Sequence, residues 1–238
     1  MAETKYEKNR REKQAAQARK KKKRIMRKVA KVGLGLGVAL IVILLLVIMI
    51  KSLSTEKYVR AAVPTLHVNL DGSITLEEMG LLDEPVKTRK IKKELLKDIK
   101  EYNEKSGSNI SIDEIEVDKA GNVYLRTSYS NAKEYSDYSG YECFSGTVGD
   151  ALNAGYPFSS TFMLVTGKVK ASAIDIDSIM SGTMDKVVIV RENITVTVPG
   201  SIVYVSDLST QMSGEDTVFI SQRDGNRDAT DLVYIIYK

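Results

Sequence analysis

The sequence predicts an α+β protein: one transmembrane helix, then an extracytoplasmic domain with a helix-bearing N-terminal half and a β-rich C-terminal half. Three observations predict this class. A strongly basic N-terminus precedes nineteen uncharged residues, 32–50. Apolar side chains recur at helical spacing from Ile91 to Tyr102. Runs rich in Val, Ile, Thr and Tyr dominate the chain after residue 160.

These patterns divide the chain into four parts. We expect a basic cytoplasmic tail at 1–31, a transmembrane helix at 32–50, a stalk at 51–63 and one α+β domain at 64–238. A sub-boundary would fall near 155–165 if the two halves of that domain fold separately. The sequence leaves open whether they share one core.

Charge is divided unevenly along the 238 residues. Residues 1–31 carry a net charge of +11 and the remainder carries −7, which together give the formal +4 of the chain. A basic tail attracts anionic lipid or nucleic acid, whereas an acidic body is repelled by both. With one cysteine, no internal disulfide can form. A disulfide-free exported domain favours a Gram-positive bacterial cell envelope over an endoplasmic-reticulum lumen.

The apolar run from Val32 to Ile50 has the length of a membrane span. At about 1.5 Å per residue it reaches roughly 28 Å, close to the hydrocarbon thickness of a bilayer. The Lys/Arg excess precedes it, so the positive-inside rule places the N-terminus in the cytoplasm and the C-terminal domain outside. We therefore predict an uncleaved signal anchor in the cell membrane. Cleavage as an export signal is the alternative, although signal peptides usually have a shorter apolar core.

Residues at and before the entry to this run suggest two contacts. Gly33 and Gly37 form a small-xxx-small pair, which would allow a dimer through the membrane helix. Nine basic residues are predicted to hold the topology and to lie on anionic headgroups. They are Arg19, Lys20, Lys21, Lys22, Lys23, Arg24, Arg27, Lys28 and Lys31. Binding to nucleic acid is disfavoured, because the tail has a single aromatic residue and no recognition fold.

Within the domain, turn signals separate the expected elements. A hairpin is predicted around Asp71-Gly72, and an amphipathic helix from Asp83-Glu84-Pro85 to Ser106-Gly107. A second hairpin should turn near Ala120 to Asn122, and "GDALNAG" at 149–155 should form a short helix. Strands are then expected at 160–174, 186–198, 202–206, 216–222 and 231–237.

Residues 64–222 resemble a group of uncharacterised surface lipoproteins of Clostridia, especially gut Lachnospiraceae. The stretches that carry the resemblance are "GTVGDALNAGY" and "IVYVSD", together with "EYNEKSG" at the end of the predicted helix. The resemblance implies an exported cell-envelope protein and supplies no catalytic residue. Here a membrane helix would replace the lipid-modified cysteine of that group.

The sequence carries no catalytic, cofactor or metal signature. Cys143 and His67 are 76 residues apart and lack a local motif, so Cys143 is expected to be a small buried residue and His67 to face solvent. The spacing of Asp224, Asn226 and Asp228 imitates a calcium loop, but Ala229 replaces the required glycine. We expect a protein that is not an enzyme and that needs no cofactor.

Tyrosines offer the best candidate for a contact surface. The segment "YSNAKEYSDYSGYE" and its surroundings mix tyrosine with Ser and Asn, a combination that suits glycan or peptide contacts. The residues chosen are Tyr129, Tyr135, Tyr138 and Tyr141. Strand packing and a solvated loop are the competing explanation.

The sequence therefore predicts a membrane-anchored envelope protein that displays a non-enzymatic binding domain for a protein, peptide or glycan. Two alternatives stay open. One is an accessory or regulatory subunit of a membrane transport or signalling system. The other is an exported hydrolase with an unrecognised site.

Overall fold

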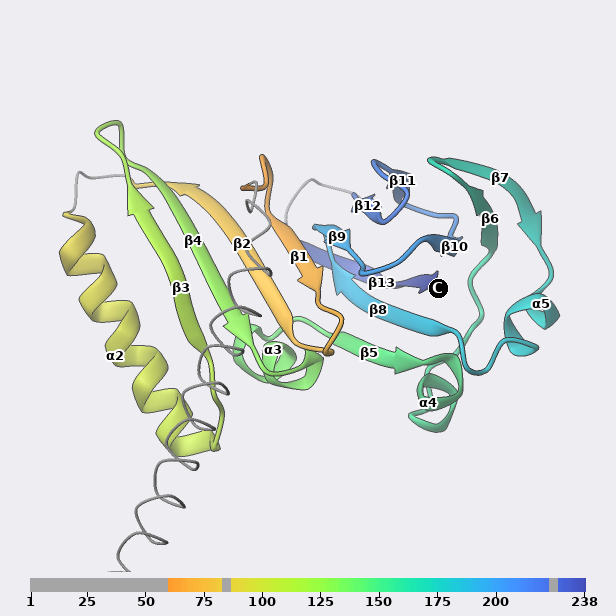
Figure 1. Ribbon diagram of the computed structural model, residues 1–238, viewed down its shortest axis with the longest axis horizontal. Coiled ribbons are helices and arrows are strands. Elements are labelled where there is room, and N and C mark those ends of the chain that lie inside the picture. Colours follow the sequence, from red (N-terminus) through yellow and green to blue (C-terminus); the bar gives the residue numbers. More distant parts are fainter. Residues whose placement is uncertain (1–59, 83–86, 223–226) are drawn as a thin grey trace, which may run out of the picture. The chain divides into compact units, whose positions relative to one another are not determined.

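The computed structural model describes residues 60–82, 87–222 and 227–238, which form a mostly β-sheet protein (Figure 1). Strands account for 44% and helices for 22% of this part of the chain. The predicted α+β class, with its helix-bearing first half, is therefore wrong. The first half contributes five of its own strands, and four of them join strands of the second half in one sheet.

The described residues contain thirteen strands and four helices. The strands are β1 (Thr65–Val68), β2 (Ile74–Leu81), β3 (Ser111–Val117), β4 (Asn122–Tyr129), β5 (Cys143–Thr147), β6 (Phe162–Thr166), β7 (Val169–Ile174), β8 (Lys186–Glu192), β9 (Thr195–Thr197), β10 (Ile202–Ser206), β11 (Thr210–Met212), β12 (Thr217–Ile220) and β13 (Asp228–Tyr237). The helices are α2 (Thr88–Ser106), α3 (Ala132–Ser139), α4 (Val148–Asn153) and α5 (Ile176–Met180).

None of the helices in this described part is long and apolar enough to cross a bilayer. We therefore correct the predictions of a transmembrane helix, a signal anchor and a single-pass protein of the cell membrane, because the structure gives them no support. The tail, the predicted span at 32–50 with Gly33 and Gly37, and the basic residues from Arg19 to Lys31 lie outside the described residues.

Residues 60–238 belong to one compact unit, built on two sheets. Sheet A has seven strands in the order β11-β12-β9-β1-β2-β4-β3, and sheet B has six in the order β5-β8-β13-β10-β6-β7. The pairing of β1 with β9 is parallel, and the other strand pairs are antiparallel. Sheet A thus takes strands from both ends of the sequence, which explains why a division into two halves fails.

The main core lies between the two sheets. Leu66 and Ile74 of sheet A share one cluster of buried residues with Val188 and Val190 of sheet B. The alternate residues of β8 point to the other side of sheet B, where Val187 and Ile189 pack with residues of α4 and α5 in a second cluster. Because side chains alternate along a strand, sheet B is apolar on both faces.

Turn and capping residues set the element ends, and several were predicted correctly. The hairpin of β1 and β2 turns at Gly72, whose φ is 84°. The hairpin of β3 and β4 turns at Gly121, where φ is 88°. Helix α2 ends at Gly107, which adopts the left-handed conformation that glycine tolerates best. Helix α4 begins with a capping box of Thr147 and Asp150.

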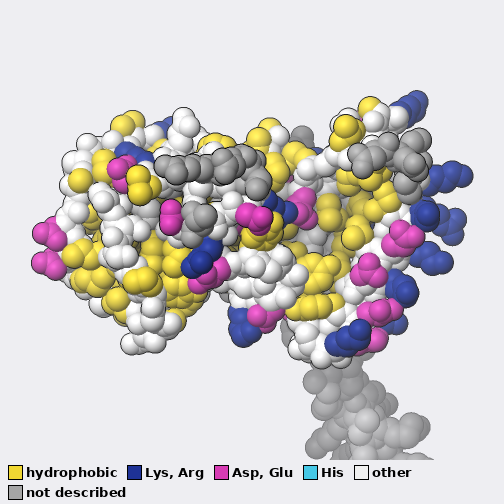
Figure 2. Space-filling view, turned by 180° about the vertical axis from the view of Figure 1, so that it is seen from behind, with side chains coloured by type: hydrophobic (Ala, Val, Ile, Leu, Met, Phe, Trp, Pro, Cys, Tyr) yellow, Lys and Arg dark blue, Asp and Glu magenta, His cyan; other side chains and the backbone are white. Residues whose placement is uncertain are grey.

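Helix α2 lies along the outer strand β3 and buries Ile99. Its Lys and Arg side chains project from the opposite side, where Figure 2 shows them gathered along one margin of the molecule. The lysine-rich face is therefore solvated. Residues 83–86, the expected start of this helix, lie outside the described residues.

Candidate functional site

Two of the four tyrosines predicted as a contact surface lie in the interior. Tyr129 is 3% exposed and Tyr135 is fully buried, while Tyr138 and Tyr141 are partly buried against the same core. The rings of Tyr129 and Tyr135 meet edge to face, with centroids 5.2 Å apart. Buried side chains are not accessible to a partner, so Tyr129 and Tyr135 build the core, whereas a contact through the partly exposed Tyr138 and Tyr141 stays a prediction.

Helix α3 explains why these tyrosines turn inward. The Asn131 side chain caps the helix by accepting a hydrogen bond from the Glu134 N–H at 2.9 Å, and Gly140 ends it. Residues three apart lie on one face of a helix, so Tyr135 and Tyr138 both pack on the core. Asn131 of the same segment is the helix cap, and the hydroxyls of Ser136 and Ser139 hydrogen-bond the backbone of Cys143 and Tyr141.

A partly buried network of charges connects α3 with both sheets. The Tyr135 hydroxyl donates to Glu192 Oε2 at 2.5 Å, and Glu192 of sheet B is 1% exposed. Arg227 donates to Glu192 and to Glu78 of sheet A, and its guanidinium lies 4.9 Å from the centre of the Tyr141 ring. Burial raises the pKa of Glu192, whereas the hydrogen bond from Tyr135 and the charge of Arg227 act in the opposite direction. The network joins structural elements rather than forming an open site.

The structure points Cys143 and His67 into different environments. Cys143 is 6% exposed in the core between the sheets, and burial raises the pKa of its thiol, which disfavours the reactive thiolate. The neighbours of His67 on β1, Leu66 and Val68, point into that core, so His67 points to the other face of sheet A. There its Nε2 lies 2.7 Å from Oε1 of the buried Glu77. The His67 side chain is 24% exposed, so it is only partly open to solvent on that face.

Across residues 60–82, 87–222 and 227–238, no group of three or more His, Cys, Asp or Glu side chains is placed to hold a metal ion. Two members of the calcium-like spacing, Asp224 and Asn226, lie outside these ranges. Asp228 is the first residue of β13, and its carbonyl accepts a hydrogen bond from Asn193 Nδ2 at 3.3 Å.

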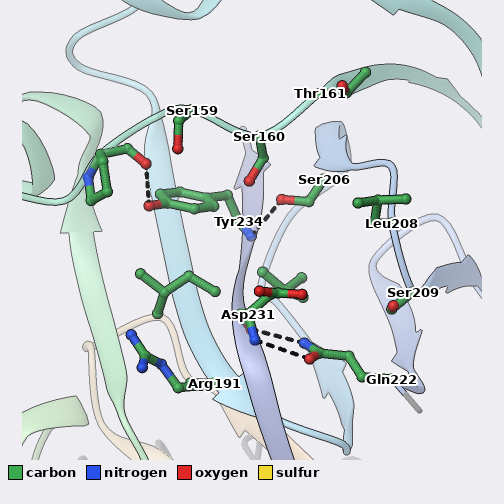
Figure 3. A pocket seen from close by; sticks show the side chains of 13 residues that line it. Ser159, Ser160, Thr161, Arg191, Ser206, Leu208, Ser209, Gln222, Asp231 and Tyr234 are labelled. Atoms are coloured by element: carbon green, nitrogen blue, oxygen red, sulfur yellow. Dashed lines mark hydrogen bonds between the residues drawn. The ribbon is translucent and has the colours of Figure 1, made fainter.

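The best candidate site is a pocket of about 460 Å³ on sheet B (Figure 3). It lies where the loop 154–161 meets the end of β10 and the first half of β13. Its volume falls within the range of about 300–1,000 Å³ that is usual for ligand pockets. Five of its lining side chains carry hydroxyl groups on short side chains, namely Ser159, Ser160, Thr161, Ser206 and Ser209.

The pocket exists because two neighbouring strands separate. β13 pairs with β10 only from Ile235 onward. Before that point side chains replace the missing strand: Ser206 Oγ accepts from the Tyr234 N–H at 2.9 Å. The Gln222 amide donates to the Asp231 carbonyl at 2.8 Å and accepts from the Asp231 N–H at 3.0 Å (Figure 3). The backbone is thus satisfied without a partner strand, and the space beside it stays open.

The loop above the pocket is fixed at both ends. The Tyr234 hydroxyl donates to the Pro157 carbonyl at 2.5 Å, and the Asp207 N–H donates to the Thr161 carbonyl at 2.8 Å. Burial raises the pKa of Tyr234 to about 12, so the phenol keeps its proton at neutral pH. Between these anchors Ser159 and Ser160 point toward the Tyr234 ring (Figure 3).

The opposite rim carries an exposed apolar side chain and a strained residue. Leu208 is 74% exposed beside the pocket. Ser209 has a φ of 63°, a left-handed conformation that among the described residues other than glycine occurs only here. Strained backbone conformations persist only where the surrounding structure enforces them, and they cluster at functional sites.

Two charged residues border the pocket and differ in their availability. The guanidinium of Arg191 lies 3.0 Å from the Glu142 carboxylate, so its charge is already compensated. Asp231 is held through its backbone, which leaves its exposed carboxylate able to accept hydrogen bonds from a ligand. Among the described residues, the lining contains neither His, Cys nor Lys. Its polar groups are hydroxyls, an amide, the Arg191 guanidinium and the Asp231 carboxylate.

Comparisons of the chain with protein-family models, with curated proteins and with solved structures found no match. The resemblance to clostridial surface lipoproteins therefore stays an expectation from the sequence. The fold and the pocket are the observations from which a function can be argued.

Sequence reasoning missed this pocket because its residues come from distant segments. Ser159 and Ser160 lie in a loop, Ser209 follows β10, and Asp231 is in the last strand. One local signal was available: the polar run Ser159-Ser160-Thr161 comes directly after Pro157 and Phe158 in a stretch expected to begin a strand.

Proposed function

We propose that residues 60–238 form a non-enzymatic binding domain whose pocket on sheet B takes a neutral, hydroxyl-rich ligand of saccharide type. The observation that carries the proposal is the lining itself. Besides Ser206, which is 3% exposed and accepts a hydrogen bond from the Tyr234 N–H, four short hydroxyl side chains and one available carboxylate line a pocket of about 460 Å³. Each hydroxyl can both donate and accept, which matches the alternating donors and acceptors of a sugar ring.

The charged residues at the pocket favour a neutral ligand over an anionic one. The Asp231 carboxylate repels anions and accepts hydrogen bonds from hydroxyl groups. Because Arg191 is engaged by Glu142 at 3.0 Å, it offers little attraction to a carboxylate or phosphate on the ligand. A neutral polyol gains the charge-assisted hydrogen bond to Asp231 without the cost of burying a second charge.

Preorganisation supports binding as well. Gln222, Ser206 and Tyr234 hold the walls by hydrogen bonds of 2.5–3.0 Å that do not involve the ligand-facing hydroxyls of Ser159 and Ser160. A site with fixed walls loses less conformational entropy when it binds. Leu208 at the rim supplies an apolar surface on which the C–H face of a sugar ring can pack.

The test is titration calorimetry of the full-length chain with neutral monosaccharides and disaccharides, with glucuronate as the anionic counterpart. Asp231→Asn keeps the size of the side chain and the backbone bonds to Gln222 but removes the charge. Loss of a charge-assisted hydrogen bond of about 1.5–3 kcal/mol predicts affinity at least about tenfold weaker.

The matched control is Asp98→Asn on the exposed face of α2, which should leave the affinity unchanged. Two results would contradict the proposal: no neutral saccharide binds at millimolar concentration, or Asp231→Asn binds as tightly as the native chain. Tighter binding of glucuronate than of glucose would contradict the argument from charge.

A further inference from the structure

A second pocket, of about 660 Å³, lies against β5 at the edge of sheet B. The rings of Phe144 and Tyr156 form one side of it, with their centroids 5.1 Å apart. Residues of α3, including Ala132 and Ser136, form the other side. We call it the aromatic pocket. Its volume is within the usual range of about 300–1,000 Å³ for ligand sites, so it has room for a ligand group of its own.

Two contacts join the aromatic pocket to the first pocket. Arg191 lines the first pocket on the side opposite Leu208 (Figure 3), and its guanidinium lies 3.0 Å from Glu142, which lines the aromatic pocket. Pro157 of the first pocket directly follows Tyr156 of the aromatic pocket in the chain. The side chains of Arg191 and Glu142 are 44% and 40% exposed, so this shared wall reaches the surface and a ligand can extend across it.

The aromatic rings and the first pocket lie on the same face of sheet B. Phe144 is the pairing partner of Ile189, and both pack in the cluster on the face that α4 and α5 cover. Side chains alternate between the faces along a strand, so Arg191 shares the face of Ile189. Tyr234, which lines the first pocket, belongs to the same cluster. A ligand that fills both pockets therefore stays on one surface of the sheet.

The two rings of the aromatic pocket are held in place by their surroundings. A Cβ atom at Gly146 would lie 2.9 Å from the Phe144 ring, so the glycine allows this ring to lie back along β5. Burial, and then the charge of Glu142, raise the pKa of Tyr156, so its hydroxyl keeps its proton at neutral pH and can donate. Rings that are fixed before binding lose little conformational entropy when a ligand packs on them.

The polar groups of the aromatic pocket suit a neutral ligand. Its two charged residues are both paired, Lys133 with Asp137 at 2.6 Å and Glu142 with Arg191 at 3.0 Å. The Asn131 side-chain oxygen caps α3, whereas its amino group is exposed and makes no hydrogen bond within the described part of the chain. An available amide donor beside apolar rings matches the hydroxyl groups and the C–H face of a sugar ring.

We infer that the ligand is an oligosaccharide: one sugar ring occupies the first pocket, and another ring of the same saccharide packs on Tyr156 and Phe144 in the aromatic pocket. This inference rests on the proposed function, since it takes the first pocket as a saccharide site. The saccharide crosses the wall formed by Arg191 and Glu142, whose charged groups can exchange hydrogen bonds with its hydroxyls. Affinity should then rise with chain length, because the second ring binds as part of a molecule that is already held.

Titration calorimetry of the full-length chain with saccharides of increasing length tests this. The probes are glucose, cellobiose and cellotriose, with the corresponding maltotriose and chitotriose series beside them. In the series that binds most tightly, the trisaccharide should bind at least about tenfold more tightly than the monosaccharide. Tyr156→Leu keeps an apolar side chain on Phe144 but removes the flat ring. It should abolish most of this gain and leave the affinity for the monosaccharide unchanged.

Tyr204→Leu is the matched control, because Tyr204 packs in the same cluster but lines neither pocket as the structure describes them. It should keep the full gain. Asp231→Asn should weaken binding of the monosaccharide and the trisaccharide alike, which reports on the first pocket alone. If the monosaccharide binds through Asp231 but no series gains from length, or if Tyr156→Leu keeps the gain, this inference is wrong and the proposed function stands. A chain that binds no saccharide of any length would overturn both.

Discussion

The tyrosine-rich segment around α3 and the serine-lined pocket on sheet B differ in a way that reverses what their sequences suggest. The tyrosines look like a recognition surface, yet Tyr129 and Tyr135 are buried and hydrogen-bonded or stacked in the core. The pocket is built from serines scattered along the chain, which look like loop residues. Local composition indicates which interactions a side chain can make, whereas tertiary packing decides whether it makes them with the protein or with a ligand.

The largest expected effect tests whether Tyr135 is structural. Tyr135→Ala removes a fully buried ring and the hydrogen bond that it donates to Glu192. Loss of a buried aromatic side chain costs about 3–5 kcal/mol, and the carboxylate left without this donor adds to it. Denaturant unfolding of the full-length chain should show a correspondingly lower midpoint.

Ser160→Ala at the pocket is the comparison for that measurement and should change the free energy of unfolding by less than about 1 kcal/mol. If Tyr135→Ala were equally mild, the contrast between the two regions would be lost, and the tyrosine segment would again become a candidate surface.

A second, smaller effect concerns pH. Arg227→Met keeps the contact with the Tyr141 ring but leaves Glu192 without its cation. Removing one partner of a buried pair costs about 3–5 kcal/mol, and because Arg227 is partly exposed we expect about 2 kcal/mol at neutral pH. The pKa of Glu192 is already raised by burial, and losing the cation raises it further.

The sign of the pH dependence follows from that raised pKa. A carboxyl whose pKa is raised in the folded state contributes most to folding stability at pH values below its unfolded-state pKa, near 4.5. There the group is protonated in both the folded and the unfolded state. Its contribution is lost as pH rises through the folded pKa. The destabilisation by Arg227→Met should therefore be largest at pH 7–8 and shrink toward pH 4.5, as measured by unfolding at each pH. Arg191→Met, whose partner Glu142 is exposed, should show little change. A pH-independent loss would contradict the role given to Glu192.

Much of the local structure could be predicted from the sequence, because it rests on short-range chemistry. Asp71-Gly72, Ala120 to Asn122 and Ser106-Gly107 mark turns and a helix end that the structure confirms. The fold class could not, because sheet A unites β1 to β4 with β9, β11 and β12 across more than a hundred residues. The parallel pairing of β1 with β9 leaves no local pattern in either strand.

The candidate site could not be predicted from the sequence, because it also depends on residues from distant segments. A pocket that forms where β10 and β13 separate depends on Gln222 and Ser206 replacing a strand, and neither residue type signals such a role. Aromatic composition pointed instead to the tyrosines, whose large apolar surface is most stable in the core. The described structure likewise gives no support to the membrane assignment, which rested on residues 32–50.

The smallest predicted effect addresses the strain at the pocket rim. Ser209 has a φ of 63°, which costs a residue with a Cβ roughly 1 kcal/mol relative to glycine. Ser209→Gly should therefore raise the free energy of unfolding by about 0.5 kcal/mol, after the greater entropy of glycine in the unfolded chain is subtracted. If the strain serves the pocket, the same variant should bind a neutral saccharide more weakly despite its greater stability, since it loses a hydroxyl and loosens the rim. Thermal unfolding and calorimetry on one preparation would show both changes. A variant that is more stable and binds equally well would mean that the strain is incidental and that the ligand is held by the loop 159–161 and Asp231.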